Sequence, residues 1–158
     1  MDPFSKEVTD HFVALFFDTY FQAFEFLSPA HFLRENTTGT LDPDLLYAVC
    51  AVYAPYSDHP GVIKSPPTSN GQIYVNRVRS KMPHLISQVS LETGHILALV
   101  ADAEYCAGNI AQGYRLDGIA GRMVLELGLH RLQLPVEFES ESARIAFEAR
   151  SRMFDVCT

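Results

Sequence analysis

Apolar residues recur at helical spacing from the first residues of the chain. Between residues 7 and 27 the steps are three and four, which places the side chains on one face of an α-helix: Phe12, Leu15, Phe16, Tyr20, Ala23, Phe24 and Leu27. The pair Ser28-Pro29 ends this predicted helix, because a residue before proline is disfavoured in the helical region. A short helical turn is expected over residues 30–35 and a loop over residues 36–40.

A further helix is expected to begin at Asp42-Pro43 and to run up to Pro55. Aspartate accepts hydrogen bonds from the free N–H groups of a first turn, and proline fits the first helical position. Residues 55–71 are rich in proline, glycine, serine and asparagine and predict the longest loop. The next helix is expected over residues 72–82, where Pro83 breaks or kinks it.

Two longer helices are predicted after that loop and helix. The first opens at residues 90–93, where a serine cap precedes an early acid, and stops at Gly108-Asn109. The second spans about residues 110–127, and Gly128 is expected in left-handed conformation behind it. Each glycine inside a helix costs about 1 kcal/mol relative to alanine. We therefore expect a neighbouring helix to approach the interior glycines closely: Gly113, Gly118 and Gly121.

A last helical pattern begins near Ser140 and is still running at Thr158. No stretch favours a strand, so the prediction is an all-α fold, an irregular array of about six helices in a single domain over residues 1–158. Nothing follows to cover a second side of the last helix, so we expect an incomplete, truncated folding unit. The apolar side chains concerned are Ile145, Phe147, Met153, Phe154 and Val156.

The charge balance argues against direct binding of duplex DNA. The 158 residues are 47% hydrophobic and 20% charged, as in globular domains, and the net charge is −7. A duplex binder needs a basic face that neutralises phosphates, and no run of lysine and arginine supplies one. The apolar run at residues 12–17 is too short to span a membrane, and the opening residues do not have the pattern of a signal peptide.

No combination of reactive side chains predicts chemistry. The cysteines Cys50, Cys106 and Cys157 are far apart, whereas a zinc cluster needs cysteines at close spacing. No histidines recur at helical spacing, and phosphate-loop and serine-elbow motifs are missing. A trio of Cys106, His130 and Asp117 can be drawn, but any chain of this size allows such a drawing. We expect no catalytic residue, no metal site and no cofactor in this chain.

The helix predicted over residues 110–127 carries a resemblance to a known family. Ser-Leu-Glu-Thr at residues 90–93 is followed by Gly-Ile-Ala-Gly-Arg-Met-Val-Leu-Glu-Leu-Gly-Leu-His-Arg at residues 118–131. This order resembles the hallmark of the fungal-specific transcription factor domain, the middle homology domain of zinc-cluster transcription factors. The matching residues are Gly118, Ala120, Arg122, Met123, Leu127, Gly128, Leu129, His130 and Arg131. Residues 11–33 and 148–154 add weaker matches, so the resemblance covers nearly the whole chain.

The sequence also departs from the family pattern. Tyr114 stands where the family usually has tryptophan, and Gly121 replaces an apolar residue. Ser151 replaces the middle arginine of the last motif, and Asp155 replaces a second aromatic residue. The zinc cluster that precedes the domain in the family is absent from these residues. The resemblance therefore covers only the first part of the family domain.

We interpret the family motif as a structural signature, not as an active site. Gly128 serves as a helix stop, and His130 as a capping or packing residue. Arg122 and Arg131 are expected either to face solvent or to pair with acids such as Glu104.

The resemblance implies a regulatory domain in the nucleus that restrains or relays activation. It would act through protein partners, namely a second copy, related factors or coregulators, or through a small-molecule effector. Zinc and DNA would be bound only by a module that is not present here. Two alternatives stay open: a standalone interaction module that dimerises with related factors and titrates them, and a small-molecule binder or enzyme built on the same fold.

Overall fold

The computed structural model describes residues 2–20, 27–63, 66–131 and 137–157, and only the backbone of residues 20, 149, 151 and 153–157. Its eight α-helices confirm the predicted all-α class, although about six were expected, and no strand occurs in the residues described. The helices are α1 Lys6–Leu15, α2 Pro29–Thr38, α3 Pro43–Tyr53, α4 Gln72–Arg79, α5 Met82–Ser87, α6 Leu91–Cys106, α7 Ile110–Glu126 and α8 Glu141–Cys157.

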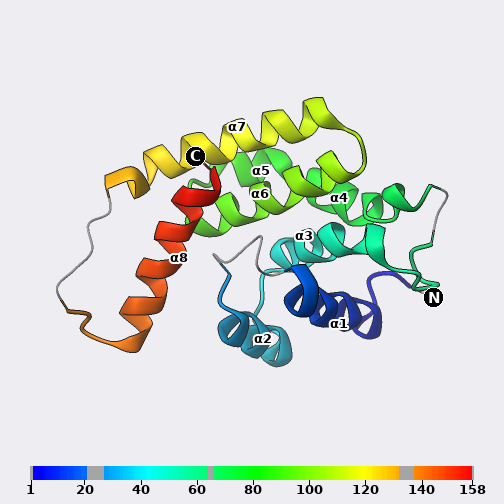
Figure 1. Cartoon of the computed structure of the whole chain (residues 1–158), viewed down its shortest axis with the longest axis horizontal. Coiled ribbons are helices and arrows are strands. Elements are labelled where there is room, and N and C mark those ends of the chain that lie inside the picture. The colour runs from blue at the N-terminus through cyan, green and yellow to red at the C-terminus, as the bar shows by residue number, and fades with distance from the viewer. Residues whose placement is uncertain (1, 21–26, 64–65, 132–136, 158) are drawn as a thin grey trace.

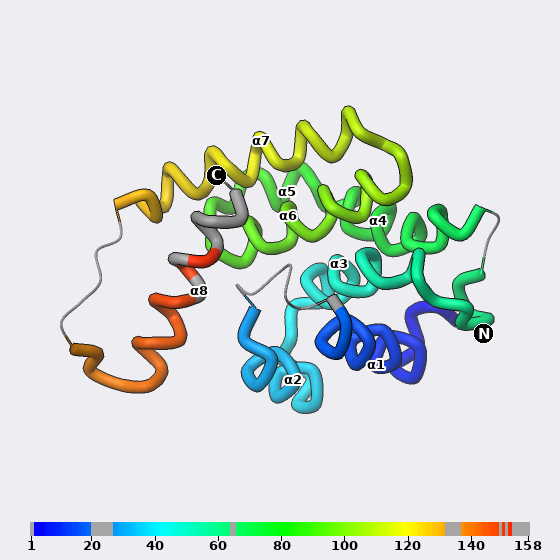
Figure 2. The backbone as a smooth tube through the Cα atoms, viewed as in Figure 1, coloured from blue at the N-terminus to red at the C-terminus, as the bar shows by residue number. Residues whose placement is uncertain are grey.

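Helix α6 lies at the centre of the arrangement. It forms an antiparallel pair with α7 on one side and packs on α3 and α4 on the other (Figure 1). Helix α1 packs against α3, and α8 contacts both α6 and α7 at one end of the pair. Figure 2 shows that the chain returns to this end only after the long connection from α7 to α8.

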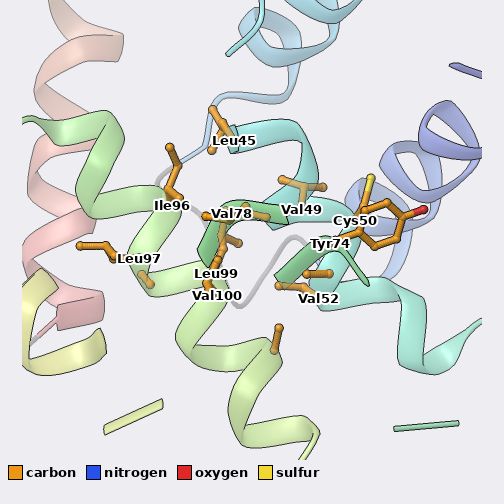
Figure 3. Packing of buried hydrophobic residues seen from close by; sticks show 14 of the residues in the cluster. Leu45, Val49, Cys50, Val52, Tyr74, Val78, Ile96, Leu97, Leu99 and Val100 are labelled. Atoms are coloured by element: carbon orange, nitrogen blue, oxygen red, sulfur yellow. The ribbon is translucent and has the colours of Figure 1, made fainter. Parts of the chain in front are cut away.

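The core is an aliphatic contact region between α3, α4 and α6 (Figure 3). Val49, Val78 and Leu99 are fully buried there. From Thr93 to Ala101 every residue of α6 is buried, so this helix is covered on all sides rather than along one stripe. Each fully buried aliphatic side chain contributes about 1.5–3 kcal/mol. The α6 segment therefore carries a large share of the stability.

The first predicted helix changes its winding part of the way along. Helix α1 begins after Ser5, whose Oγ accepts a hydrogen bond from Val8 N at 3.5 Å, and becomes a π-helix over Phe16–Tyr20. In this wider turn Phe16 is buried, and the ring of Phe17 meets Phe32 of α2 edge to face at 5.2 Å. Residues 21–26, which the prediction also assigned to this helix, lie outside the described part of the chain.

Helix α2 corrects the expectation of a short turn and a loop over residues 30–40. The helix continues to Thr38 and ends at Gly39, which has a φ of 75°. Asn36 Nδ2 donates to Asp10 Oδ1 of α1 at 2.9 Å, and Thr37 Oγ1 donates to Leu33 O at 2.8 Å. Residues of this kind favour loops in isolation, but here their side chains bond to α1 and to the preceding turn.

Most predicted helix ends are confirmed. Asp42 Oδ1 accepts from Asp44 N at 2.7 Å, and Ser90 Oγ accepts from Thr93 N at 3.1 Å. Gly108 and Gly128 end α6 and α7 with φ values of 84° and 69°. Pro83 does separate two helices, and it stands in the first turn of α5, a helix that the pattern had not indicated.

The segment predicted as the longest loop contains short 3₁₀ turns at Ala54–Tyr56 and Pro67–Ser69. It ends at Gly71, where α4 begins directly against α3. A Cβ atom at Gly71 would lie 2.4 Å from the carbonyl oxygen of Ala51. Only glycine therefore allows the two backbones to come this close.

Helix α8 bears on the expectation of an incomplete folding unit. Its residues Ile145 and Phe147 are half-buried. The side chains of Met153, Phe154 and Val156 lie outside those described, so the expectation stays a prediction.

Candidate functional site

The family-motif residues fall on two sides of α7 and the turn that follows it. Ala120, Met123 and Leu129 are buried in the core, and Leu127 packs partly against it. Four others are exposed: Gly118, Arg122, His130 and Arg131. Gly128 holds the left-handed position that stops the helix. Half of the motif therefore supports the α6–α7 pair, and the other half faces solvent.

The expected close approach over Gly118 is wrong. Gly118 is exposed, and no described atom lies within 4 Å of the place where its Cβ would be. The close contact occurs one turn earlier, at Gly113, where a Cβ would lie 2.6 Å from the ring of Tyr105. Tyr105 Oη donates to Asp117 Oδ2 at 2.7 Å, which raises the pKa of Tyr105 to about 12. The neighbour of the glycine is thus a side chain of α6, not a crossing helix.

An acid in the middle of the core links α4, α6 and α7. Glu104 is fully buried and forms an ion pair with Arg79. Asn109 Nδ2 donates to Glu104 Oε2 at 2.6 Å, and Asn109 N donates to Glu104 O at 2.8 Å. Sequence reasoning weighed Arg122 and Arg131 as partners for this acid. Its partner instead comes from α4, and only an isolated acid among apolar residues signalled the site.

The drawn catalytic trio is not brought together. Asp117 is bonded to Tyr105, whereas His130 Nε2 accepts from Arg131 Nε at 3.1 Å. Cys106 and His130 flank opposite ends of α7, which is about 25 Å long. Within the described residues, no group of histidine, cysteine and acidic side chains has a metal-binding arrangement, and no helix is long and apolar enough to cross a membrane.

A cleft of about 760 Å³ opens between α2, the first turn of α6 and the first turns of α8. Apolar side chains from all three helices and the residues before α3 line it: Leu27, Phe32, Leu41, Leu45, Leu91 and Ile145. Polar side chains line it as well: His31, Arg34, Glu35, Glu92, His95 and Glu141. These segments are far apart in sequence, so no local pattern could indicate the cleft.

One wall of the cleft is a chain of polar contacts along α2. His31 Nδ1 accepts from Arg34 Nη2 at 2.9 Å, and His31 Nε2 lies 3.2 Å from Glu35 Oε1. A neutral imidazole with its proton on Nε2 satisfies both contacts. Arg34 and Glu35 are thus joined through one ring.

The wall on α6 holds two groups with shifted pKa values. Partial burial of the Glu92 carboxyl group, together with the nearby Asp42 and Glu35, raises its pKa to about 7. Burial lowers the pKa of His95 to about 3, so this imidazole is uncharged at neutral pH. Uncompensated negative charge therefore gathers where α2, α3 and α6 meet.

Comparison with known proteins agrees with the motif on α7. Residues 13–157 match the family described as fungal specific transcription factor domain. A Zn(2)-C6 fungal-type transcription factor, FTF1c of Fusarium oxysporum f. sp. lycopersici, is 28% identical over 97% of this chain and 17% of its own length. FTF2, from the same organism and also a Zn(2)-C6 fungal-type transcription factor, is 30% identical over 80% of this chain and 12% of its own length.

The chain thus spans less than a fifth of the relatives it resembles. No solved structure matched it. The family match, however, includes nearly every described helix, together with the Leu-Gly-Leu-His-Arg turn after α7. The chain belongs to the fungal specific transcription factor domain family.

Proposed function

We propose that this chain is a regulatory domain of a zinc-cluster transcription factor and acts in the nucleus through contacts with other proteins. The observation that carries the proposal is the family match over residues 13–157. The names of the relatives state a Zn(2)-C6 transcription factor. Zinc and DNA binding are accordingly assigned to a module outside these residues, and the role of this chain is not catalytic.

The outward side of α7 supports a role in protein contacts. Ile110, Tyr114 and Leu125 are 61%, 76% and 54% exposed on this helix. Gly118 lies between them and leaves the helix backbone open to a partner. Large apolar side chains grouped on one exposed face are typical of interaction surfaces. The other parts of a transcription factor, a related factor or a coregulator are the partners that the family suggests.

A reporter assay tests the regulatory role. The chain is placed between an unrelated DNA-binding domain and a constant activation domain, and an inert helical spacer of equal length serves as the comparison. We expect the chain to change reporter output several-fold, and the pair Tyr114→Glu and Leu125→Glu to abolish the change. Gln112→Glu, an exposed change on the same helix, is the control. Equal output from chain and spacer would refute the proposal.

Effector binding is a second candidate, favoured by one observation. The cleft of about 760 Å³ joins α2, α6 and α8, so a molecule bound there would contact helices from both ends of the chain. Pockets of this volume are typical of small-molecule sites. Regulation by a bound molecule is then compatible with regulation through protein contacts, because the first could alter the second.

A further inference from the structure

We propose that the cleft between α2, α6 and α8 binds an organic ammonium compound, with the ammonium group at Glu92 and an apolar body against Phe32, Leu45 and Ile145. The inference rests on the proposed function only where the ligand is to act as an effector. Binding itself is a separate property of the chain and is measured separately.

The size and the walls of the cleft suit a small organic molecule. Its volume of about 760 Å³ lies within the range of roughly 300–1,000 Å³ that is usual for such sites. Phe32 and Leu45 are buried in its floor, and Ile145 of α8 is half-buried opposite them. An apolar body placed here removes apolar surface from water on both sides of the contact.

The charges of the cleft favour a cation. The carboxyl groups of Glu35, Glu92 and Glu141 line it, and Arg34 is the one permanent cation among its described lining residues. Arg34 is directed at the ring of His31, and the carboxylate of Glu141 is held by Arg144 on its own helix.

Glu92 is the acid of the cleft that is left for a ligand. In the described part of the chain Glu92 forms no ion pair, and its closest charged neighbours are the acids Asp42 and Glu35. Carboxyl groups in this position hold a proton because their charges repel. An ammonium group can replace that proton, since it brings a positive charge and several N–H donors to the same place.

Two rival ligands fit less well. A metal ion needs several oxygen or nitrogen ligands close together, and the described residues contain no such group. An anion would find Arg34 and the first turn of α6, but it would face three carboxyl groups across the cleft. Electrostatic complementarity therefore selects the cation.

Binding would tie together helices that are distant in sequence. Glu92 lies in the first turn of α6, Asp42 caps α3 and Glu35 lies on α2. The apolar body would reach Ile145 on α8. A bound ammonium compound would thus stabilise the position of α8 against α2, which gives an effector a structural consequence.

The test uses the whole 158-residue chain and three probes that share one apolar body: 2-phenylethylammonium, 2-phenylethanol and 3-phenylpropionate. Titration calorimetry and chemical-shift perturbation at pH 7 measure binding. We expect the ammonium probe to bind at least about tenfold more tightly than the other two, which corresponds to one charge-assisted hydrogen bond. Proton release from Glu92 should accompany binding, seen as a dependence of the heat on the buffer.

Variants locate the site. Glu92→Gln should weaken the ammonium probe at least about tenfold and abolish the proton release. Glu126→Gln, an exposed change on α7 away from the cleft, should change neither. Equal binding of all three probes, preference for the anion, or unchanged binding by Glu92→Gln would each overturn the inference. Failure of binding with an active reporter leaves the proposed function standing, whereas ligand binding with a silent reporter refutes the regulatory role instead.

Discussion

Helix α6 takes part in two regions of opposite character. From Thr93 to Ala101 it is enclosed by aliphatic side chains of α3, α4 and α7 and contributes to the dry core. Its first turn instead borders the cleft, where Glu92 meets other carboxyl groups. The core gains from close packing, while the cleft keeps unbalanced charge that packing alone would not retain. The difference separates residues for stability from residues for recognition along a single helix.

The largest effect is expected from Gly71→Ala, in the core region. The new Cβ would lie 2.4 Å from the backbone oxygen of Ala51, and backbone cannot move aside as a side chain can. We expect a loss of about 3 kcal/mol in the free energy of unfolding, at the upper end of overpacking costs. Urea denaturation followed by circular dichroism measures it. A loss below about 1 kcal/mol would mean that α3 and α4 can separate without cost.

Arg79→Met should cost about 2 kcal/mol. The change leaves the buried carboxylate of Glu104 with Asn109 but without its cation. Removing one partner of a fully buried pair costs about 3–5 kcal/mol, and the half-exposed position of Arg79 reduces this. The double variant Arg79→Met with Glu104→Gln should recover part of the loss. A double-mutant cycle with no coupling would contradict the role of this ion pair.

Glu92→Gln should stabilise the protein above neutral pH, by about 1 kcal/mol once solvent screening at this exposed residue is considered. The folded pKa of about 7 lies above the ordinary value of 4.5, so the folded state binds the proton more tightly. Stability from this group is therefore complete below pH 4.5 and is lost as the pH rises to about 7. Thermal melts should show nearly equal stability at pH 4 and a higher Tm for the variant at pH 8. A constant difference would mean that Glu92 is not the titrating group.

The smallest effect, of opposite sign to that of Gly71→Ala, is expected from Gly118→Ala. Gly118 is exposed within α7 and has no described neighbour over it, so a methyl group meets no obstacle. Alanine favours the helix by up to about 1 kcal/mol over glycine. An increase in Tm would confirm that this side of α7 is open in the isolated chain. A decrease would reveal a contact over Gly118.

The sequence predicted much of the core region and none of the cleft. Helices α6 and α7 follow from apolar runs closed by Ser90, Gly108 and Gly128, which are local signals. Helix α2 was missed because its polar end is stabilised by Asp10 of α1, a tertiary contact. Gly118 was misjudged for a related reason: a pattern shows that a helix contains glycine, but not whether a neighbour lies over it.

The partners of Glu104 and Glu92 depend on still longer connections. Arg79 comes from another helix, and the cleft joins segments around residues 27–45, 90–95 and 141–146. No spacing rule relates such segments, because their distance is set by how the helices pack. The family motif succeeded as a prediction of the family because it is local, spanning one helix and its exit.

The burial of α6 on all sides has a consequence for how the chain is made. Helices α1, α3 and α4 leave the ribosome several seconds before α6 is complete, at about 5–20 residues per second. Until then the faces of α3 and α4 that will pack on α6 have no cover. When α6 emerges, it is apolar all round and cannot lie in water alone. The first half of the chain therefore waits unfolded or held by a chaperone, and folding is completed as one event when the α6–α7 pair closes.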